Sequence, residues 1–447
     1  MTLLLLAMGG VLGLIIVLIL TDVVIRKPVV AVGLILGVTV LEAALVDTVV
    51  GISPGGVSIT VMDAVFTLVT VAAVARLLRI SPITGAQWLV VVVGAIAVFS
   101  LARGVVQFGA QTAVNESRGF LAFFGAALYF STVDITHLFP DRLRMVWLWG
   151  ASGMAVLVLA RWASWLVGVP IGVVAAQYDS AVRVLDGPQT FFLAIGFLLT
   201  LPVWKAGANN VMVRRASLLL GVGVILLNRR TVWATLIIGL LVLALRNERL
   251  GRRFAVILTI GAIATSVFLI NLPETTAGGR AVAMEVTDTG TLEWRLQGWT
   301  DLLASRPDSP TNLVFGNPMG SGYTRRQQGV TVEQQPHNFY LQVYLRLGVV
   351  GVVLLAALYA AAVSTLLRAS KRRPDSIAAL LLVVLSAQVV WQLTWAPGLE
   401  QGILVGVFAA TLGRIDALRE PAGPIAAPEP SSARALADAN PSRRPHV

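Results

Sequence analysis

Long apolar runs recur along the whole chain, and they limit what it can fold into. A run of roughly 20 apolar residues is long enough to cross a bilayer as a helix. The composition agrees, because 56% of the 447 residues are hydrophobic and only 13% are charged, whereas soluble domains carry about 25% charged residues. The sequence therefore predicts an all-α polytopic membrane protein. We expect thirteen transmembrane helices, with twelve as the alternative: 3–21, 28–46, 58–78, 86–102, 118–133, 145–168, 189–204, 211–228, 230–246, 253–271, 338–368, 376–395 and 399–415.

Basic residues lie in alternate loops, which predicts how the helices are oriented. Positively charged loops of membrane proteins face the cytoplasm. The loops at 47–57 and 396–400 contain no basic residue, and we expect them on the outer face together with the long segment 272–336. The net charge of +11 then reflects cytoplasmic loops rather than binding to nucleic acid. The basic loops contain Arg26 and Lys27; Arg76 and Arg79; Arg142 and Arg144; Lys205, Arg214 and Arg215; Arg246, Arg249, Arg252 and Arg253; Arg368, Lys371, Arg372 and Arg373; and Arg414.

The chain divides by composition into four parts. Residues 1–271 form an N-terminal transmembrane bundle, 272–336 an extracytoplasmic loop, and 337–419 the C-terminal transmembrane helices. The first run, "MTLLLLAMGGVLGLIIVLIL", lacks a basic n-region, so we interpret it as a span rather than a signal peptide. The tail 420–447 is rich in Pro, Ala and Ser, and we expect it to be disordered in the cytoplasm. The absence of cysteine excludes disulfides and thiolate metal sites.

Many arginines fall on the outer face, where the charge rule predicts few. The planar guanidinium suits phosphate oxygens, and ionisable groups at membrane depth usually face a cavity or a partner. These arginines therefore predict a site for a lipid-linked phosphate or diphosphate. Arg161 and Arg183, taken alone, also fit snorkelling to lipid headgroups. The set comprises Arg103, Arg118, Arg161, Arg183, Arg229, Arg230, Arg280, Arg295, Arg325 and Arg326.

The outer loop contains a predicted amphipathic helix and a glycine-rich turn. In "TLEWRLQGWTDLLAS" (291–305) the apolar residues recur at helical spacing, which predicts a helix on the membrane surface or over a cavity. Arg295 lies about 60° from the centre of that apolar face. The apolar face comprises Leu292, Leu296, Trp299 and Leu303. The turn "FGNPMGSGY" (315–323) is by itself a weak signal.

His337 stands at the outer end of a predicted span, in "PHNFYLQVYLRLGVVG" (336–351). Helical spacing places His337 on one face with Tyr340, Tyr344 and Gly348, which predicts a packed or cavity-lining surface. Arg346 falls on the opposite side of this helix. The alternative is that His337 simply caps the helix, although the neighbouring Asn338 is the better capping residue.

Together these motifs resemble the O-antigen ligase and polymerase superfamily. The resemblance rests on "NRRTVWATLIIGLL", "EWRLQGW", "FGNPMGSGY" and "PHNFYLQVYLRLGVVGVVLL", and it is strongest from about residue 228 to 360. It implies a GT-C-like bundle of about 12–13 transmembrane helices in the cytoplasmic (inner) membrane. It also implies a metal-independent, inverting glycosyltransferase that needs no cofactor and acts on polyprenyl-diphosphate-linked glycans.

The resemblance assigns roles to particular residues. Arg230 matches the family arginine at the outward start of a span, Arg295 the arginine of the loop, and His337 the histidine before a span. The arginines would hold the donor diphosphate, and His337 would take the proton of the attacking sugar hydroxyl, since histidine titrates near neutral pH. Arg229, Asn338 and Arg118 are further candidates for substrate binding. Glu285, Asp288 and Glu293 are competing candidates for the base.

Several functions stay open at this point. A polymerase would extend the glycan and would work with a flippase and a chain-length regulator. A ligase would transfer the glycan to a lipid or protein acceptor. A transporter of lipid-linked oligosaccharide would place its ionisable groups near the bilayer midplane and show repeated halves, and the sequence shows neither. A non-catalytic scaffold has no need of outward arginines. The "RRT" opening and "FGNPMGSGY" favour a polymerase.

Overall fold

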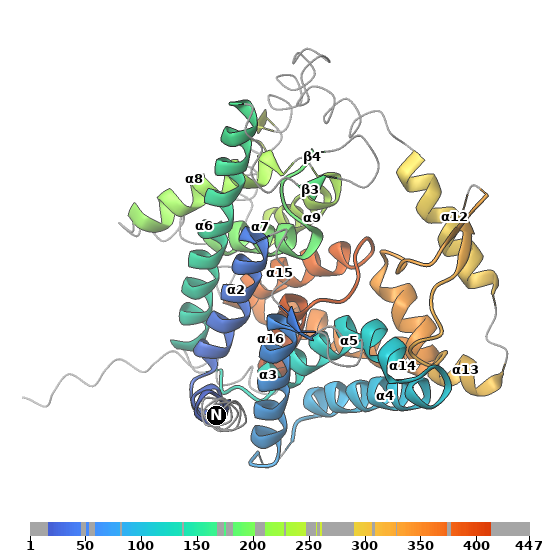
Figure 1. The fold of residues 1–447 in the computed structure, drawn as a ribbon. Helices are drawn as coiled ribbons and strands as arrows, with labels where there is room; N and C mark the ends of the chain where they lie inside the picture. Colours follow the sequence, from blue (N-terminus) through green and yellow to red (C-terminus); the bar gives the residue numbers. More distant parts are fainter. Residues whose placement is uncertain are drawn as a thin grey trace, which may run out of the picture.

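In the part of the chain that the structure describes, the fold is a bundle of helices with three short hairpins (Figure 1). The computed structural model describes residues 17–45, 51–52, 59–80, 83–135, 138–167, 174–175, 182–201, 211–227, 229–246, 256, 260–261, 290–305, 309–327, 329–372 and 377–412. The beginning of the first predicted span, nearly all of the span 253–271, and the tail 420–447 lie outside these residues. So do Arg280, Glu285 and Asp288.

Every predicted span that the described residues include overlaps a helix, and the predicted loop helix is also present. The helices are α2 (Pro28–Ala44), α3 (Val61–Leu77), α4 (Gly85–Phe108), α5 (Ala110–Ser131), α6 (Leu138–Leu166), α7 (Gly187–Thr200), α8 (Val211–Leu226), α9 (Arg230–Arg246), α12 (Gly290–Ala304), α13 (Pro310–Phe315), α14 (Phe339–Arg372), α15 (Ile377–Trp391) and α16 (Leu399–Leu412). The antiparallel hairpins are β1 (Gly51–Ile52) with β2 (Ile59–Thr60), β3 (Val174–Ala175) with β4 (Val182–Arg183), and β5 (Arg325–Gln327) with β6 (Val330–Val332).

Length and composition identify membrane-crossing helices among those described. Gly85–Phe108, Asp141–Ser164 and Phe339–Lys371 are long and apolar enough to span a bilayer. The shorter helices α2, α7, α15 and α16 are also apolar. The expected class, an all-α polytopic membrane protein, is confirmed.

Local sequence determines where several helices begin. At α4, the Thr84 hydroxyl accepts from the Gln87 backbone N–H, and the Gln87 side chain accepts from the Thr84 backbone N–H. Asp186 and Gln189 form the same kind of reciprocal cap at α7. Such capping boxes satisfy backbone donors that a helix N-terminus otherwise leaves open.

Helix α5 lies at the centre of the bundle and packs against α3, α4 and α16. Glycines of α16 allow the two backbones to approach closely, as is common between membrane helices. A Cβ atom on Gly402 would lie 2.2 Å from the carbonyl oxygen of Phe123, and one on Gly406 would lie 2.5 Å from that of Ala127. Neither position leaves room for a side chain.

Helix α14 is kinked at Gly348, whose φ of 66° lies in the left-handed region. The kink lies against the end of α13, since a Cβ on Gly348 would be 2.2 Å from the Val314 carbonyl oxygen. Glycine therefore fits this position both by its backbone conformation and by the available space. Just before the kink, the carbonyl of Leu345 accepts a hydrogen bond from the Asn317 backbone N–H at 2.7 Å.

An ion pair between α5 and α14 holds the glycine-rich turn. The Arg346 guanidinium is 1% exposed and pairs with the Glu116 carboxylate. Glu116 also accepts from the backbone N–H groups of Gly320 and Gly322 at 3.0 and 2.9 Å. Arg346 donates to the Ser321 hydroxyl at 2.7 Å and to the carbonyl of Gly322. The turn, which was only a weak signal in the sequence, is thus bound by the buried Arg346 and the largely buried Glu116.

The same turn is also fixed on α4. Arg103 donates to the Gly316 carbonyl at 2.9 Å, and the Met319 backbone N–H donates to the Ser100 carbonyl at 3.3 Å. Gly104 brings the turn into direct contact with the helix, because a Cβ there would lie 1.8 Å from the Met319 carbonyl oxygen. Helices α4, α5 and α14 therefore meet around this turn (Figure 1).

We expect Arg346→Ala to lower the free energy of unfolding by about 3–5 kcal/mol, because it leaves the Glu116 carboxylate without its partner in a buried site. Thermal unfolding of the purified protein in detergent measures this. Arg26→Ala is the control, since the Arg26–Asp22 pair lies on the surface with side chains 74% and 55% exposed, and such pairs contribute about 0–1 kcal/mol. Equal unfolding temperatures for the two variants would contradict the structural role of the pair.

Candidate functional site

His337 lies two residues before the start of α14, and its neighbour Asn338 caps the helix. The Asn338 side-chain oxygen accepts from the Leu341 backbone N–H at 3.0 Å, which is the usual N-cap bond. The capping role therefore falls to Asn338, and the alternative role for His337 as the cap is wrong. The imidazole of His337 instead lies edge-on against the indole of Trp395, with ring centroids 5.2 Å apart.

Trp395, in the loop between α15 and α16, joins His337 to Arg229. The guanidinium carbon of Arg229 lies 5.3 Å from the centroid of the Trp395 ring, a cation–π contact. The indole also stacks on Trp391, with centroids 5.4 Å apart and planes inclined by 12°. A histidine and an arginine that are distant in sequence therefore contact the same aromatic side chain.

The position of Trp395 is set by its neighbours. Gly187, the first residue of α7, leaves space for the indole, because a Cβ there would lie 2.2 Å from the Trp395 Cζ3 atom. The loop itself is held at both sides. Gln401 donates to the Ala396 carbonyl at 3.0 Å, and the Phe339 backbone N–H donates to the Gln392 carbonyl at 2.8 Å. The second bond ties the start of α14 to the end of α15, so His337 and Trp395 are positioned together.

The two adjacent arginines at the start of α9 differ in environment. Arg229 is buried and donates to the Leu185 carbonyl. Arg230, the first residue of α9, has an exposed side chain. Arg229 therefore contributes a fixed positive charge beside Trp395, and Arg230 adds a second positive charge at the surface.

Arg295 lies on α12, and the buried face of this helix differs from the predicted one. Of the predicted apolar face, Trp299 packs on the protein, whereas the side chains of Leu296 and Leu303 are 48% and 53% exposed. Trp299 and Leu302 provide the packed face, as they contact a cluster formed by Tyr323, Leu341, Tyr344 and Leu345. Arg295 is half-buried. Gly298, which the apolar spacing does not include, also lies against the hairpin, close to Gln327 and Arg325.

Hairpin β5–β6 supports α12 through two buried polar side chains. A Cβ on Gly298 would lie 2.1 Å from the Gln327 side-chain nitrogen. Arg325 donates to the carbonyls of Tyr323 and Gln334, at 3.1 and 2.5 Å. Burial lowers the pKa of Arg325 and raises the pKa of Tyr323 to about 12. Tyr323 is therefore a neutral hydrogen-bonding group rather than a base at neutral pH.

Several of the outward arginines bind the chain's own backbone. Arg161 is 2% exposed and donates to the carbonyls of Val184 and Ala43, so the interpretation as a headgroup-snorkelling residue is wrong. Arg103 and Arg325 likewise donate to carbonyls, as described above. The side chain of Arg183 lies outside the described part of the structure. The expected ring of anion-binding arginines is therefore smaller than the sequence predicted.

Arg118 lies apart from the Trp395 contacts, on α5. Its side chain forms an ion pair with Asp63 of α3 at 3.7 Å and lines a cavity between helix ends. Of the three carboxylates that were alternative candidates for the base, the structure describes Glu293, which is exposed on the first turn of α12. No group of three or more histidine and carboxylate side chains among the described residues is placed to share a metal ion.

Sequence reasoning missed Trp395, and only its position offered a signal. It lies four residues after Trp391 and directly before the outward loop 396–400, which contains no basic residue. The arrangement places an imidazole and a guanidinium beside one indole. It can combine a proton acceptor with stabilisation of developing negative charge, as acid–base and electrostatic catalysis require.

Comparison with known proteins supports the resemblance that the motifs indicated. Residues 216–356 match the family model described as O-Antigen ligase. This segment, about a third of the chain, contains Arg229, Arg230, Arg295, His337 and Asn338. No curated protein matches the chain in sequence. The resemblance to the O-antigen ligase and polymerase superfamily is confirmed over these residues, and it indicates ligase- or polymerase-type activity.

We expect Gly187→Ala to lower the free energy of unfolding by about 1–3 kcal/mol, the usual cost of overpacking, because the added methyl group displaces the Trp395 indole. Gly85→Ala is a matched control. Gly85 is also the first residue of a helix with a capping box, but a Cβ there would meet nothing within 4 Å. Thermal unfolding in detergent compares the two, and an unchanged Gly187→Ala variant would show that Trp395 is not fixed by this contact.

Proposed function

We propose, from the match to the O-antigen ligase family and from the geometry around Trp395, that this protein is a metal-independent glycosyltransferase. It acts on polyprenyl-diphosphate-linked glycans at the outer face of the cytoplasmic membrane. The observation that carries the proposal is the convergence of His337 and Arg229 on one indole. A glycosyl transfer from a diphosphate needs a base and a fixed positive charge.

The proposed reaction uses a leaving group that is already activated. The acceptor hydroxyl attacks the anomeric carbon of the donor, and the bond from that carbon to the diphosphate oxygen breaks. The hydroxyl proton passes to His337, and the diphosphate leaves with its negative charge. Arg229, Arg230 and Arg295 stabilise that charge, since guanidinium groups bind phosphate oxygens in a bidentate manner. The reaction requires neither a nucleotide nor a metal ion.

The polymerisation of polysaccharide repeat units is the activity we favour. The "RRT" opening of α9 and the glycine-rich turn at 315–323 support it, because both resemble exopolysaccharide polymerases. A ligase that transfers the glycan to a lipid or protein acceptor is the second candidate, since the matching family model is that of O-Antigen ligase. A polymerase would work with a flippase that supplies the lipid-linked unit and with a regulator of chain length.

The proposed orientation follows from the basic loops. Residues 1–271 form the N-terminal bundle, 272–336 the outer loop and 337–419 the C-terminal helices, with the tail 420–447 in the cytoplasm. His337, Arg229 and Trp395 all flank helix ends assigned to the outer face. A transporter would instead place its charged groups near the midplane.

We expect His337→Ala to reduce glycosyl transfer by about 10²–10⁴-fold, the usual contribution of a general base. The assay supplies the reconstituted protein with polyprenyl-diphosphate-linked glycan and resolves product length on a gel. His137→Ala is the control, because His137 precedes a span in a loop assigned to the cytoplasm. A ladder from the wild type that disappears only in the His337 variant identifies a polymerase that uses this residue.

Two other results would contradict the proposal. Full activity of His337→Ala would remove the histidine from the site. A wild type that forms no glycosidic product with a lipid-linked or core-lipid acceptor, yet moves lipid-linked glycan across vesicles, would identify a transporter.

We expect Arg230→Ala and Arg295→Ala to lower the turnover number by about 10²–10³-fold, because each removes a donor to the developing diphosphate charge. Arg→Lys at either position loses the planar fork and should also fail. Arg326→Ala is the control, since Arg326 is an exposed residue of the same outer loop. Normal product from both alanine variants would remove the diphosphate site from this part of the molecule.

A further inference from the structure

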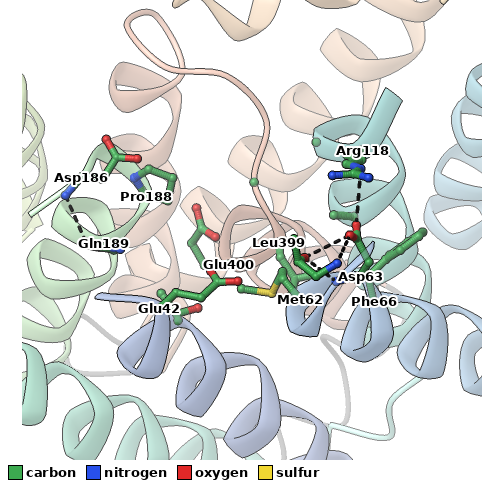
Figure 2. Close-up of a pocket in the computed structure, with 15 residues that line it drawn as sticks. Glu42, Met62, Asp63, Phe66, Arg118, Asp186, Pro188, Gln189, Leu399 and Glu400 are labelled. Carbon is green, nitrogen blue, oxygen red and sulfur yellow. Dashed lines mark hydrogen bonds and ion pairs between the residues drawn. The ribbon is translucent and has the colours of Figure 1, made fainter. Parts of the chain in front are cut away.

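The cavity that Arg118 lines has a volume of about 290 Å³ and lies between the ends of five helices (Figure 2). The C-terminal end of α2, the N-terminal parts of α3, α5 and α7, and the start of α16 surround it. The loop charges assign all five of these ends to the outer face, the same side as His337. The cavity therefore opens where the proposed glycosyl transfer takes place.

The lining of this cavity is acidic. Glu42, Asp63, Asp186 and Glu400 contribute carboxylates, and Arg118 contributes one guanidinium. Two of the acids have a local explanation as helix caps. Asp63 accepts from the backbone N–H of Thr60, at 2.8 Å, at the start of α3. Asp186 is the N-cap of α7. Acidic residues at these positions stabilise a helix whatever the cavity holds.

Helix capping does not explain Glu42, and for Glu400 it explains the position in the first turn of α16 but not the burial of the carboxylate. Glu42 lies in the last turn of α2, where the helix dipole disfavours a negative charge. Glu400 is 3% exposed, and its Oε1 atom accepts no hydrogen bond from the described part of the chain. A buried carboxylate oxygen without a donor is costly. Figure 2 shows these two side chains next to each other, between Asp186 and Asp63.

The cavity shares a wall with the candidate site around Trp395. Gly398 and Glu400 line the cavity and directly follow the loop that carries Trp395. On the opposite wall, Asp186 lines the cavity, and the adjacent Gly187 packs on the Trp395 indole. A ligand in the cavity therefore lies beside the residues that we assign to glycosyl transfer.

We propose that this cavity binds the terminal sugar of the acceptor glycan, through hydrogen bonds to Glu42 and Glu400. The inference rests on the proposed function, because it assigns the second substrate of that reaction. Carboxylates only accept hydrogen bonds when ionised, so they select donors such as sugar hydroxyls or an ammonium group. The lining has four carboxyl groups and one guanidinium, so it suits hydrogen-bond donors better than a diphosphate or a uronic acid, which leaves the donor diphosphate to the arginines.

The size and the donor set of the cavity agree with a sugar ring. Its volume is at the lower end of small-molecule sites, which range from about 300 to 1,000 Å³, so it suits a small ring and not a polyprenyl chain. The aromatic and thioether side chains of Phe66 and Met62 line the same cavity as the carboxylates. Such a mixture of apolar surface and a few polar groups is typical of ligand sites.

Kinetics with separable substrates test the proposal. The donor is polyprenyl-diphosphate-linked glycan, and the acceptor is a labelled methyl glycoside of the same repeat unit, which has no diphosphate and cannot act as a donor. We expect Glu400→Gln and Glu42→Gln to raise the KM for the acceptor at least about tenfold, the effect of losing a hydrogen bond to a charged group. The KM for the donor should change less than about twofold. Glu333→Gln, at an exposed position of the outer loop, is the matched control.

Binding measurements separate this inference from the glycosyltransferase proposal. Saturation-transfer NMR on the full-length protein in detergent would use methyl glycosides of glucose, glucosamine and glucuronic acid, which share a ring and differ in charge. We expect signals from the first two, lost in Glu400→Gln, and none from the glucuronide. Stronger transfer to glucosamine than to glucose would identify an ammonium rather than hydroxyls as the preferred donor.

Other results would contradict one of the two proposals. Binding of the glucuronide, equal signals in the wild type and Glu400→Gln, or a raised KM for the donor alone would overturn the acceptor site. A wild type that binds glucoside through Glu400 but forms no glycosidic product would overturn the proposed transfer reaction, and the cavity would then be a sugar site of another function.

Discussion

The buried ion pair between Glu116 and Arg346 is the interaction on which the outer half of the structure depends. Two charges removed from water are stabilising only when their remaining hydrogen-bonding positions are filled. Here the backbone of the glycine-rich turn fills them, with two N–H groups on Glu116 and a carbonyl on Arg346. This glycine-rich turn connects α13 to the β5–β6 hairpin, which supports α12. The position of Arg295 therefore depends on a salt bridge that the arginine itself does not touch.

Trp395 has a comparable role on the other side of the candidate site. Its indole contacts the start of α9, the start of α7 and His337, two residues before α14, so it links segments that are far apart in the chain. Gln392 and Gln401 fix the loop that carries it, through a buried network that also contains the Tyr359 hydroxyl. The imidazole and the guanidinium are thereby held by residues of the C-terminal helices, and the adjoining carboxylates of the acidic cavity belong to the same framework.

The sequence predicted the long apolar helices well, because each of them, such as α4 or α15, consists of a continuous stretch of apolar residues. The site was predictable only in part. His337, Arg229 and Arg230 stand at helix ends, where polar residues are conspicuous, but Trp395 and Glu116 contact partners from other segments, and no local pattern encodes that. On α12, helical spacing identified Trp299, which is packed, but not Gly298, which lies against the hairpin and has no side chain that such a pattern can include.

The break at Gly348 has a consequence for how α14 can vary. A continuous helix transmits rotation, so inserting or deleting one residue turns everything beyond it by about 100°. At Gly348 the backbone leaves the helical region, and the carbonyl of Leu345 is bound to Asn317 of the preceding turn rather than within the helix alone. The first turns of α14, which follow His337, are therefore positioned by their hydrogen bond to the outer loop. The longer membrane segment beyond the break is held separately, by the hydrogen bond from the Tyr359 hydroxyl to Gln392, so different parts of the protein orient the two halves of α14.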